Sequence, residues 1–318
     1  MIKTCLVTGG CGFIGTNLIN KISGQIPNIR VIDNLSVGRY ENIEQFGAEF
    51  IKGDIRDSGL IEKCLQGVEL VIHLAAHTGV VNSVEDPSSD FEVNAASTFN
   101  LLNLSKRHGV KKVIFASTGG AILGERTPPI HEGMVPKPIS PYGASKLAAE
   151  AYCLAFWGSY GLKTTILRFS NVYGQYSNNK SSVVAQFMKD ILANKTLAVY
   201  GDGKQTRDFL FAEDLVSAVL SAVGFNGEAD VFQIASGKEV SILELVDMLK
   251  KVCGRPDLKI HFKPARQGEV RRNFSKIDKA KKILNYKPVV DLETGLRKTW
   301  EWFLKSKSQD LETAKIKR

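Results

Sequence analysis

The stretch TGGCGFIG at residues 8–15 decides the fold of this chain. It follows a run of mostly apolar residues, 2–8, and leads into the helical spacing Leu18, Ile19 and Ile22. A buried strand, a glycine-rich turn and a helix in this order are typical of a dinucleotide-binding unit, because free N–H groups at the helix N-terminus attract phosphates. The sequence therefore predicts a nucleotide site near the start of the chain.

Each glycine of this turn has its own predicted role. Gly9 permits the tight turn, Gly12 lets a pyrophosphate approach the backbone, and Gly15 lets the helix pack closely against the strand. Phe13 and Ile14 lie within the same turn and are predicted to contact the cofactor.

A second predicted strand, residues 29–32, is followed at once by Asp33. An acidic residue at a strand end can accept hydrogen bonds from the adenosine ribose hydroxyls and repels a 2′-phosphate, so NAD is favoured over NADP. The alternative is that Asp33 only caps the following loop. Asn34 and Gly38, in that loop, are further predicted contacts of the cofactor.

Two more predicted strands, 49–52 and 70–73, are followed by residues that suit a nucleotide pocket. Asp54 could accept a hydrogen bond from the adenine amine, and small residues after the later strand leave room for the cofactor. Ligands bind at such strand ends in doubly wound sheets. The predicted contacts here are Asp54, Ile55, Leu74, Ala75 and Ala76.

Tyr142 and Lys146 are four residues apart, which places them on one face of a helix. A nearby ammonium is expected to lower the pKa of the phenol from its usual value of about 10 toward neutral pH. The pair then provides a proton acceptor, so Tyr142 is the predicted base and Lys146 its partner.

Composition and charge restrict the class of protein. The 318 residues can bury a large core, and the net charge of +9 comes from basic residues spread along the chain. This disfavours nucleic acid and predicts some attraction for an anionic small ligand. No apolar run approaches the roughly 18 residues that span a bilayer. Five cysteines without a Cys-x-x-Cys pair indicate reduced thiols in the cytoplasm, and histidine spacing predicts no metal site.

Taken together, eight ordered motifs resemble the extended short-chain dehydrogenases/reductases, and more narrowly the NAD-dependent epimerase/dehydratase family that acts on nucleotide sugars. The resemblance covers nearly the whole chain. The motifs are TGGCGFIG (8–15), DNL (33–35), GDIRD (53–57), HLAA (73–76), ST (117–118), YGASK (142–146), LRFSNVYG (167–174) and GDGKQTRDF (201–209).

The alternation of strands and helices through about residue 170 predicts an α/β fold with a parallel sheet. The resemblance implies a Rossmann-type, doubly wound sheet with NAD bound to residues 1–170. Residues 171–318 would form mainly a smaller substrate-binding lobe, with some segments returning to the sheet, and the protein would be a homodimer through its long helices. Predicted helices include 90–107, 183–193, 213–223, 241–252, 275–284 and 292–304.

The resemblance also implies further residues of the catalytic and cofactor sites. A fifth strand from residue 112 ends in two hydroxyls, of which Thr118 matches the catalytic position best and Ser117 is the alternative if the register slips by one. Such a hydroxyl can pass the proton of the reacting sugar oxygen to Tyr142. Asn94 and Phe169 are additional predicted cofactor contacts.

Residues 119 and 120 indicate the reaction type. Family members that eliminate water follow the catalytic threonine with Asp-Glu, whereas this chain has Gly119-Gly120. Decarboxylases carry an acidic residue nearby, which is also missing. The remaining chemistry is oxidation and reduction, which favours a 4-epimerase. The usual Val-Tyr-Gly is replaced by ILG at 122–124, and this leaves the substrate identity open.

The matching positions imply a site for a nucleotide sugar, most simply a UDP-sugar. Arg207 and Arg266 match diphosphate-binding arginines, and Asn171 matches a substrate-binding asparagine. Asn273 stands where side-chain size controls entry of a 2-acetamido group, and its intermediate size leaves both kinds of hexose open. The predicted substrate contacts are Ser83, Thr118, Asn171, Val199, Tyr200, Arg207, Arg266 and Asn273.

Three alternatives keep the same motifs. A 4-reductase or dehydrogenase would change the redox state of its cofactor, and an epimerase could act on a CDP- or GDP-sugar. A non-catalytic NAD-binding protein is the third alternative, against which the intact set of Thr118, Tyr142 and Lys146 argues.

Overall fold

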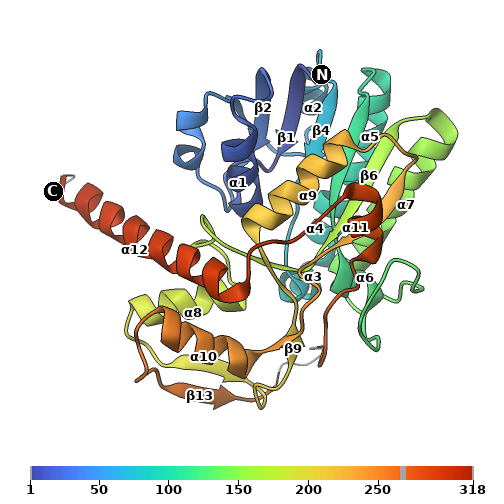
Figure 1. The fold of residues 1–318 in the computed structure, drawn as a ribbon. Coiled ribbons are helices and arrows are strands. Elements are labelled where there is room, and N and C mark those ends of the chain that lie inside the picture. The colour runs from blue at the N-terminus through green and yellow to red at the C-terminus, as the bar shows by residue number, and fades with distance from the viewer. Residues whose placement is uncertain (1, 266–269, 317–318) are drawn as a thin grey trace.

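A computed structural model describes residues 2–265 and 270–316, and its centre is a parallel sheet of seven strands in the order β11-β6-β5-β4-β1-β2-β3 (Figure 1). Every neighbouring pair in this sheet is parallel, which confirms the predicted α/β, doubly wound class. The strands are β1 (Thr4–Thr8), β2 (Asn28–Asp33), β3 (Glu49–Lys52), β4 (Leu70–His73), β5 (Lys112–Thr118), β6 (Lys163–Phe169) and β11 (Asp230–Ile234).

Helices cover both faces of the sheet because its strands are apolar on both sides. Cys5 and Val7 of β1 belong to one core cluster, while Leu6 between them belongs to the other. The first cluster includes α1 (Phe13–Ile22), α9 (Ala212–Gly224) and α11 (Asp278–Leu284). The second includes α2 (Ser58–Cys64), α5 (Ser97–Arg107) and α7 (Pro141–Tyr160).

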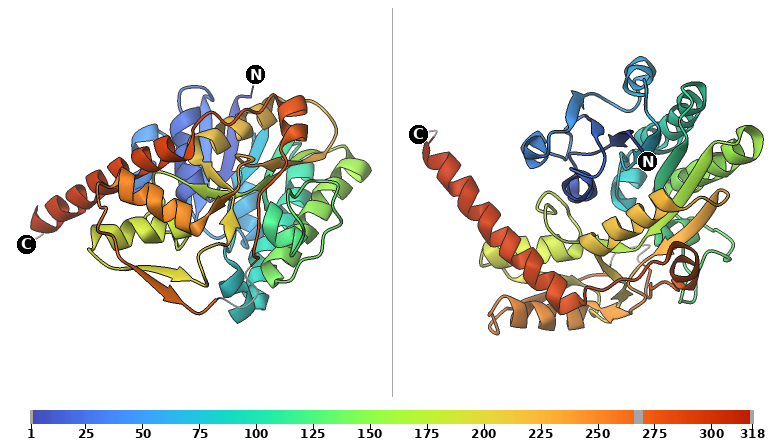
Figure 2. Two further views of the ribbon diagram at one scale, coloured as in Figure 1. Left: turned by 60° about the horizontal axis from the view of Figure 1, so that its bottom comes forward. Right: turned by 45° about the horizontal axis from the view of Figure 1, so that its top comes forward.

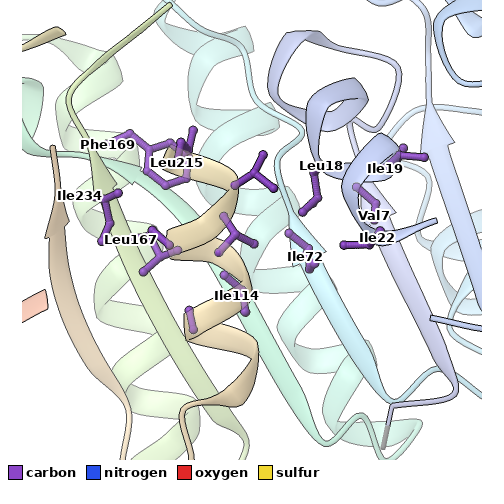
Figure 3. Packing of buried hydrophobic residues seen from close by; sticks show 14 of the residues in the cluster. Val7, Leu18, Ile19, Ile22, Ile72, Ile114, Leu167, Phe169, Leu215 and Ile234 are labelled. Carbon is purple, nitrogen blue, oxygen red and sulfur yellow. The ribbon is translucent and has the colours of Figure 1, made fainter. Parts of the chain in front are cut away.

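Figure 3 shows how the first cluster is built. Leu18 and Ile22 of α1 point onto strand residues such as Val7 and Ile72, and Leu215 of α9 lies near Phe169. These contacts hold α1 and α9 against the sheet.

The predicted long helix at 90–107 is one helical stretch in the structure, but it is not uniform. It starts earlier, with α4 (Pro87–Phe91), passes through a widened π-helical turn, η3 (Glu92–Ala96), and continues as α5. Asp86 caps the start by accepting a hydrogen bond from the Ser89 N–H at 3.0 Å, and a proline at the first helical position suits this geometry.

A second lobe follows β6 in sequence and has its own core. Its sheet pairs β8 (Leu197–Tyr200) with β13 (Ile260–Lys263), and its helices are α8 (Val183–Leu192), α10 (Ile242–Val252) and α12 (Leu292–Ile316). β11 lies beyond residue 170 yet belongs to the main sheet. The division at residue 170 stays a prediction.

α12 departs from the prediction in its length. The expected end was residue 304, whereas the helix continues to Ile316 and extends away from the rest of the molecule (Figures 1 and 2). Residues 305–316 contain neither glycine nor proline and are rich in good helix formers, which explains the continuation.

Short elements complete the described chain. They are η1 (Tyr40–Asn42), η2 (Glu44–Phe46), α3 (Val80–Glu85), α6 (Gly119–Leu123), β7 (Asn171–Tyr173), β9 (Thr206–Arg207), β10 (Phe209–Phe211) and β12 (Val240–Ser241). Within residues 2–265 and 270–316, no helix combines the length and the apolar character needed to cross a membrane.

Candidate active site

Many of the predicted cofactor-binding residues lie at the carboxyl ends of the parallel strands. The strand order reverses between β1 and β4, and such a switch point is where doubly wound sheets bind their ligands. The turn after β1, the loops after β2, β3 and β4, and the end of β5 all meet at this edge.

The glycine-rich turn has the geometry that its sequence predicts. Gly9 has φ +70°, and a Cβ atom on Gly15 would lie 2.4 Å from the Gly9 carbonyl oxygen. Both positions therefore require glycine. Gly12 precedes α1 without a side-chain cap, so the first N–H groups of the helix are available for an anion. The turn fits the diphosphate of a dinucleotide.

The Asp33 carboxylate stabilises the loop around it, in addition to its predicted role in binding the ribose. Its carboxylate accepts hydrogen bonds from the Cys11 N–H at 3.0 Å and the Leu35 N–H at 2.8 Å. Burial raises the pKa of Asp33, and these two backbone contacts oppose that effect. A Cβ atom on Gly38 would lie 2.5 Å from the Cys11 backbone, so this loop packs onto the glycine-rich turn. Both predicted readings of Asp33, capping and ribose binding, are compatible with this geometry.

The Asp54 carboxylate already uses its hydrogen-bond acceptor positions within the protein, which bears on its predicted contact with adenine. Its two oxygens accept four hydrogen bonds, from Arg56 N, Nε and Nη2 and from Asn34 Nδ2, at 2.9–3.0 Å. The Arg56 guanidinium holds the pKa of this carboxyl well below its usual range. Because a carboxylate offers about four acceptor positions, an adenine amine would have to displace one of these donors.

A buried chain of hydrogen bonds joins the end of β1 to the π-helical turn. The Thr98 hydroxyl donates to the Asn94 carbonyl at 2.7 Å, so His73 Nε2 carries a proton and donates to Thr98 at 3.0 Å. His73 Nδ1 then accepts from the Thr8 hydroxyl at 2.7 Å. Burial, followed by the nearby Lys146, lowers the pKa of His73 to about 3.

Asn94, a predicted cofactor contact, is buried and supports the loop after β4. Its amide exchanges two hydrogen bonds with the His77 backbone, at 2.9 and 3.0 Å, and donates to Asp90 at 2.8 Å. The Ala75 N–H donates to the Thr8 hydroxyl at 3.1 Å. Loop residues 75–77 are therefore positioned from both ends.

Tyr142 and Lys146 lie on α7 as predicted. The prediction that Lys146 lowers the pKa of the Tyr142 phenol is wrong for the protein without its ligands. Burial, followed by the charge of Asp90, raises the pKa of Tyr142 to about 12. Lys146 donates to the Ala116 carbonyl at 3.0 Å and lies 4.8 Å from the Phe115 ring centre. Burial lowers the pKa of this lysine to about 8. Loss of water is the largest cause of both pKa shifts.

The two hydroxyls at the end of β5 have different surroundings. Ser117 is buried and donates to Glu150 of α7 at 2.6 Å, and Glu150 forms an ion pair with Arg168 at 2.7 Å. Thr118 is half-buried and precedes α6. Successive strand residues face opposite sides. The structure therefore gives Ser117 a packing role and leaves Thr118 as the candidate for catalysis.

The glycines after Thr118 are in contact with two amides. A Cβ atom on Gly119 would lie 2.4 Å from Gln233 Oε1, and one on Gly120 would lie 2.3 Å from Asn273 Nδ2. The predicted specificity residue Asn273 thus lies directly against the start of α6. Gln233 is buried on β11, and neither polar atom of its side chain has a hydrogen-bond partner among the described residues.

The remaining substrate positions are spread over the second lobe and α3. Arg207 donates to the carbonyls of Thr206 and Val270 at 2.7 and 2.8 Å. Ser83 is buried in α3 and donates to the Val80 carbonyl at 2.7 Å. Asn171 is exposed on β7, Val199 is buried in β8, and Tyr200 is half-buried beside it. Arg266 lies outside the described residues.

Five predicted cofactor contacts are apolar residues of the core or its edge. Phe169 lies at the end of β6, Phe13 and Ile14 begin α1, and Ile55 and Leu74 follow β3 and β4. Sequence reasoning did not single out three residues that contact the candidate site: Glu150 and Arg168 beside Ser117, and Gln233 beside Gly119. For Glu150 a signal existed, since it follows Lys146 by one helical turn.

The parallel sheet, the glycine-rich turn and the Tyr142–Lys146 helix define a dinucleotide-binding protein of the Rossmann type. No group of three or more potential metal ligands occurs in the part of the chain that the structure describes. Residues 5–235 match the NAD dependent epimerase/dehydratase family. The chain belongs to this family and is an NAD-dependent enzyme of its nucleotide-sugar 4-epimerase/dehydratase group.

Individual relatives extend over nearly the whole chain. A UDP-glucose 4-epimerase of Mycolicibacterium smegmatis is 37% identical and covers 96% of this chain and 99% of its own. The structure of a UDP-glucose 4-epimerase from Thermotoga maritima, solved with UDP-glucose, is 39% identical with a TM-score of 0.91, covering 95% and 99%. A UDP-N-acetylglucosamine 4-epimerase from Methanobrevibacter ruminantium is 32% identical with a TM-score of 0.90, covering 96% and 99%.

Proposed function

We propose that the protein interconverts the gluco and galacto forms of a UDP-hexose or UDP-N-acetylhexosamine, as a 4-epimerase that keeps its NAD bound. Relatives named for UDP-glucose and for UDP-N-acetylglucosamine both match nearly the full chain. The substrates of these relatives favour a UDP-sugar for this protein, and they leave open whether C2 of the sugar carries a hydroxyl or an acetamido group.

The environment after Thr118 carries the proposal. Elimination of water needs an acid and a base next to the sugar. Gly119 and Gly120 have no side chains, and the groups packed against them are the neutral amides of Gln233 and Asn273. This arrangement supports oxidation and reduction at one carbon rather than elimination.

The proposed proton transfers use the chain's own residues. Tyr142 as phenolate takes the proton of the sugar 4-hydroxyl, directly or through Thr118, and gives it back when the 4-keto sugar is reduced. Lys146 keeps a positive charge close to the phenolate. When bound, NAD⁺ would supply a hydride acceptor for C4, and its positively charged nicotinamide ring would favour the phenolate. The 4-keto sugar would turn within the pocket before the hydride returns to its opposite face. The cofactor ends in its original redox state, so none is consumed.

The substrate class is tested by an NMR assay with UDP-galactose and UDP-N-acetylgalactosamine, without added cofactor. Formation of the gluco epimer supports the proposal, and the ratio of the two rates shows whether the 2-acetamido group is accepted. A folded, NAD-containing protein that forms neither epimer would contradict it.

The catalytic role of Tyr142 is tested by Tyr142→Phe. We expect the turnover number to fall at least about 100-fold, because a general base contributes roughly 10² to 10⁴ in rate. Tyr152→Phe, which changes an exposed tyrosine of the same helix, is the matched control and should keep its activity. A turnover number of Tyr142→Phe within threefold of wild type would contradict the assignment of Tyr142 as the general base.

A further inference from the structure

A segment of the second lobe, residues 175–180, reaches back to the nucleotide-binding half of the molecule. We call it the bridging segment; it connects β7 to α8. Three hydrogen bonds join the halves: Asn17 Nδ2 to the Gln175 carbonyl at 3.0 Å, Asn179 Nδ2 to the Val37 carbonyl at 3.0 Å, and Lys180 Nζ to Thr78 Oγ1 at 3.1 Å.

The three partners in the other half belong to three different parts of the cofactor site. Asn17 lies in the first turns of α1, directly after the glycine-rich turn. Val37 lies in the loop that starts at Asp33, and Thr78 lies in the loop that follows β4. The bridging segment therefore contacts all three of these parts.

The bridging segment is also fixed to its own lobe. The Ser177 hydroxyl donates to the Gly174 carbonyl at 2.6 Å, and Lys189 of α8 donates to the Lys180 carbonyl at 2.8 Å. The ring of Tyr176 lies 5.1 Å from that of Trp302 on α12. The segment therefore connects the second lobe rigidly to the cofactor loops.

Lys180 brings a positive charge to this edge. Burial lowers the pKa of its ammonium, and no ion pair joins it to a carboxylate within residues 2–265 and 270–316. A cation that is partly removed from water without a carboxylate beside it is stabilised by an anionic ligand. The dinucleotide offers such an anion in its diphosphate.

We propose that the bridging segment retains NAD, with Lys180 providing a positive charge for the diphosphate of the cofactor and Asn179 keeping the segment attached to the loop after β2. The proposal rests on NAD binding and does not depend on which sugar nucleotide is the substrate.

The test measures the release of NAD rather than catalysis. Purified protein with its bound NAD is mixed with excess isotopically labelled NAD, and exchange is followed by rapid gel filtration and mass spectrometry. We expect Lys180→Met to exchange at least about fivefold faster than wild type, since a hydrogen bond involving a charged group is worth more than the corresponding 1 kcal/mol. Asn179→Ala loses a neutral hydrogen bond, worth about 1 kcal/mol, and should exchange about fivefold faster. Lys180→Arg, which keeps the charge, should stay within about twofold of wild type.

Lys282→Met is the control, because it removes one positive charge from an exposed position on α11. Faster exchange confined to Lys180→Met and Asn179→Ala supports the proposal. Exchange of Lys180→Met within twofold of wild type would overturn it, as would equal acceleration in Lys282→Met. Unchanged exchange together with a raised KM for a UDP-sugar would assign the lysine to the substrate diphosphate and also overturn it.

Discussion

His73 shows at the residue scale how burial determines protonation. Its ring is 1% exposed and each nitrogen has a hydroxyl partner, Thr8 on one side and Thr98 on the other. The pKa of His73 is about 3, against about 6.5 for an exposed histidine. Below pH 6.5 the unfolded chain binds a proton here that the folded protein does not, so stability is lost as the pH falls.

We therefore expect the free energy of unfolding to decrease by about 2 kcal/mol between pH 7.5 and pH 5 through this one group, at about 1.36 kcal/mol for each pH unit below 6.5. Urea unfolding at both pH values measures it. His73→Gln, which keeps a donor and an acceptor but does not titrate, should lose correspondingly less. An equal loss in both proteins would show that other groups cause the acid sensitivity.

At the scale of elements, a buried ion pair and a neighbouring serine join α7, β6 and β5. Glu150 of α7 accepts from Arg168 of β6 at 2.7 Å and from Ser117 of β5 at 2.6 Å, and both charged side chains are at most 5% exposed. Removing one member leaves the other charged and buried, which is more costly than removing both. The pair thus fixes α7, and with it Tyr142, against the sheet.

Each single variant, Glu150→Leu or Arg168→Met, should lower the free energy of unfolding by about 3–5 kcal/mol, while the double variant should lose less than the sum. Urea unfolding of the four proteins provides the double-mutant cycle. The ion pair of half-buried Arg30 with exposed Glu49 is the control, and Glu49→Gln should change stability by less than about 1 kcal/mol. Additive losses at Glu150 and Arg168 would contradict the coupling.

At the scale of the whole molecule, an aromatic surface over α5 and α7 bears on assembly. Phe99, Tyr152 and Tyr160 are 40–56% exposed, and the rings of Phe99 and Tyr152 are in tilted contact with their centres 5.0 Å apart. Aromatic residues are enriched in protein interfaces. We propose that this surface joins two copies of the chain, in line with the homodimer through long helices that the family resemblance implies.

Light scattering after gel filtration should then give twice the mass of one chain for the wild type. Phe99→Asp combined with Tyr152→Asp should give the mass of a single chain, because two charges would be buried in the interface. Val289→Asp, at an exposed apolar residue between α11 and α12, is the control and should stay dimeric. A dimer that survives the double change would place the interface elsewhere.

Local patterns predicted the fold correctly, together with the helix that carries Tyr142 and Lys146, while the roles of the site residues stay predictions. The apolar runs became strands where expected, Gly9 and Gly15 have the constraints that the turn motif implies, and Tyr142 and Lys146 share a face of α7. These features depend on residues close in sequence, where periodicity and glycine spacing carry the information. The family likewise followed from the order of short motifs.

By itself the sequence determined the order of strands and helices and the glycine-rich nucleotide turn, and it proposed which side chains react. Only the tertiary structure decided which polar groups are paired and how they titrate. The partners of the Asn179–Val37 hydrogen bond are 142 residues apart in sequence, and those of the Thr8–His73 bond are 65 apart. No local sequence pattern predicts such pairs. The raised pKa of Tyr142 and the lowered pKa of Lys146 come from burial, which exists only once distant segments have packed together.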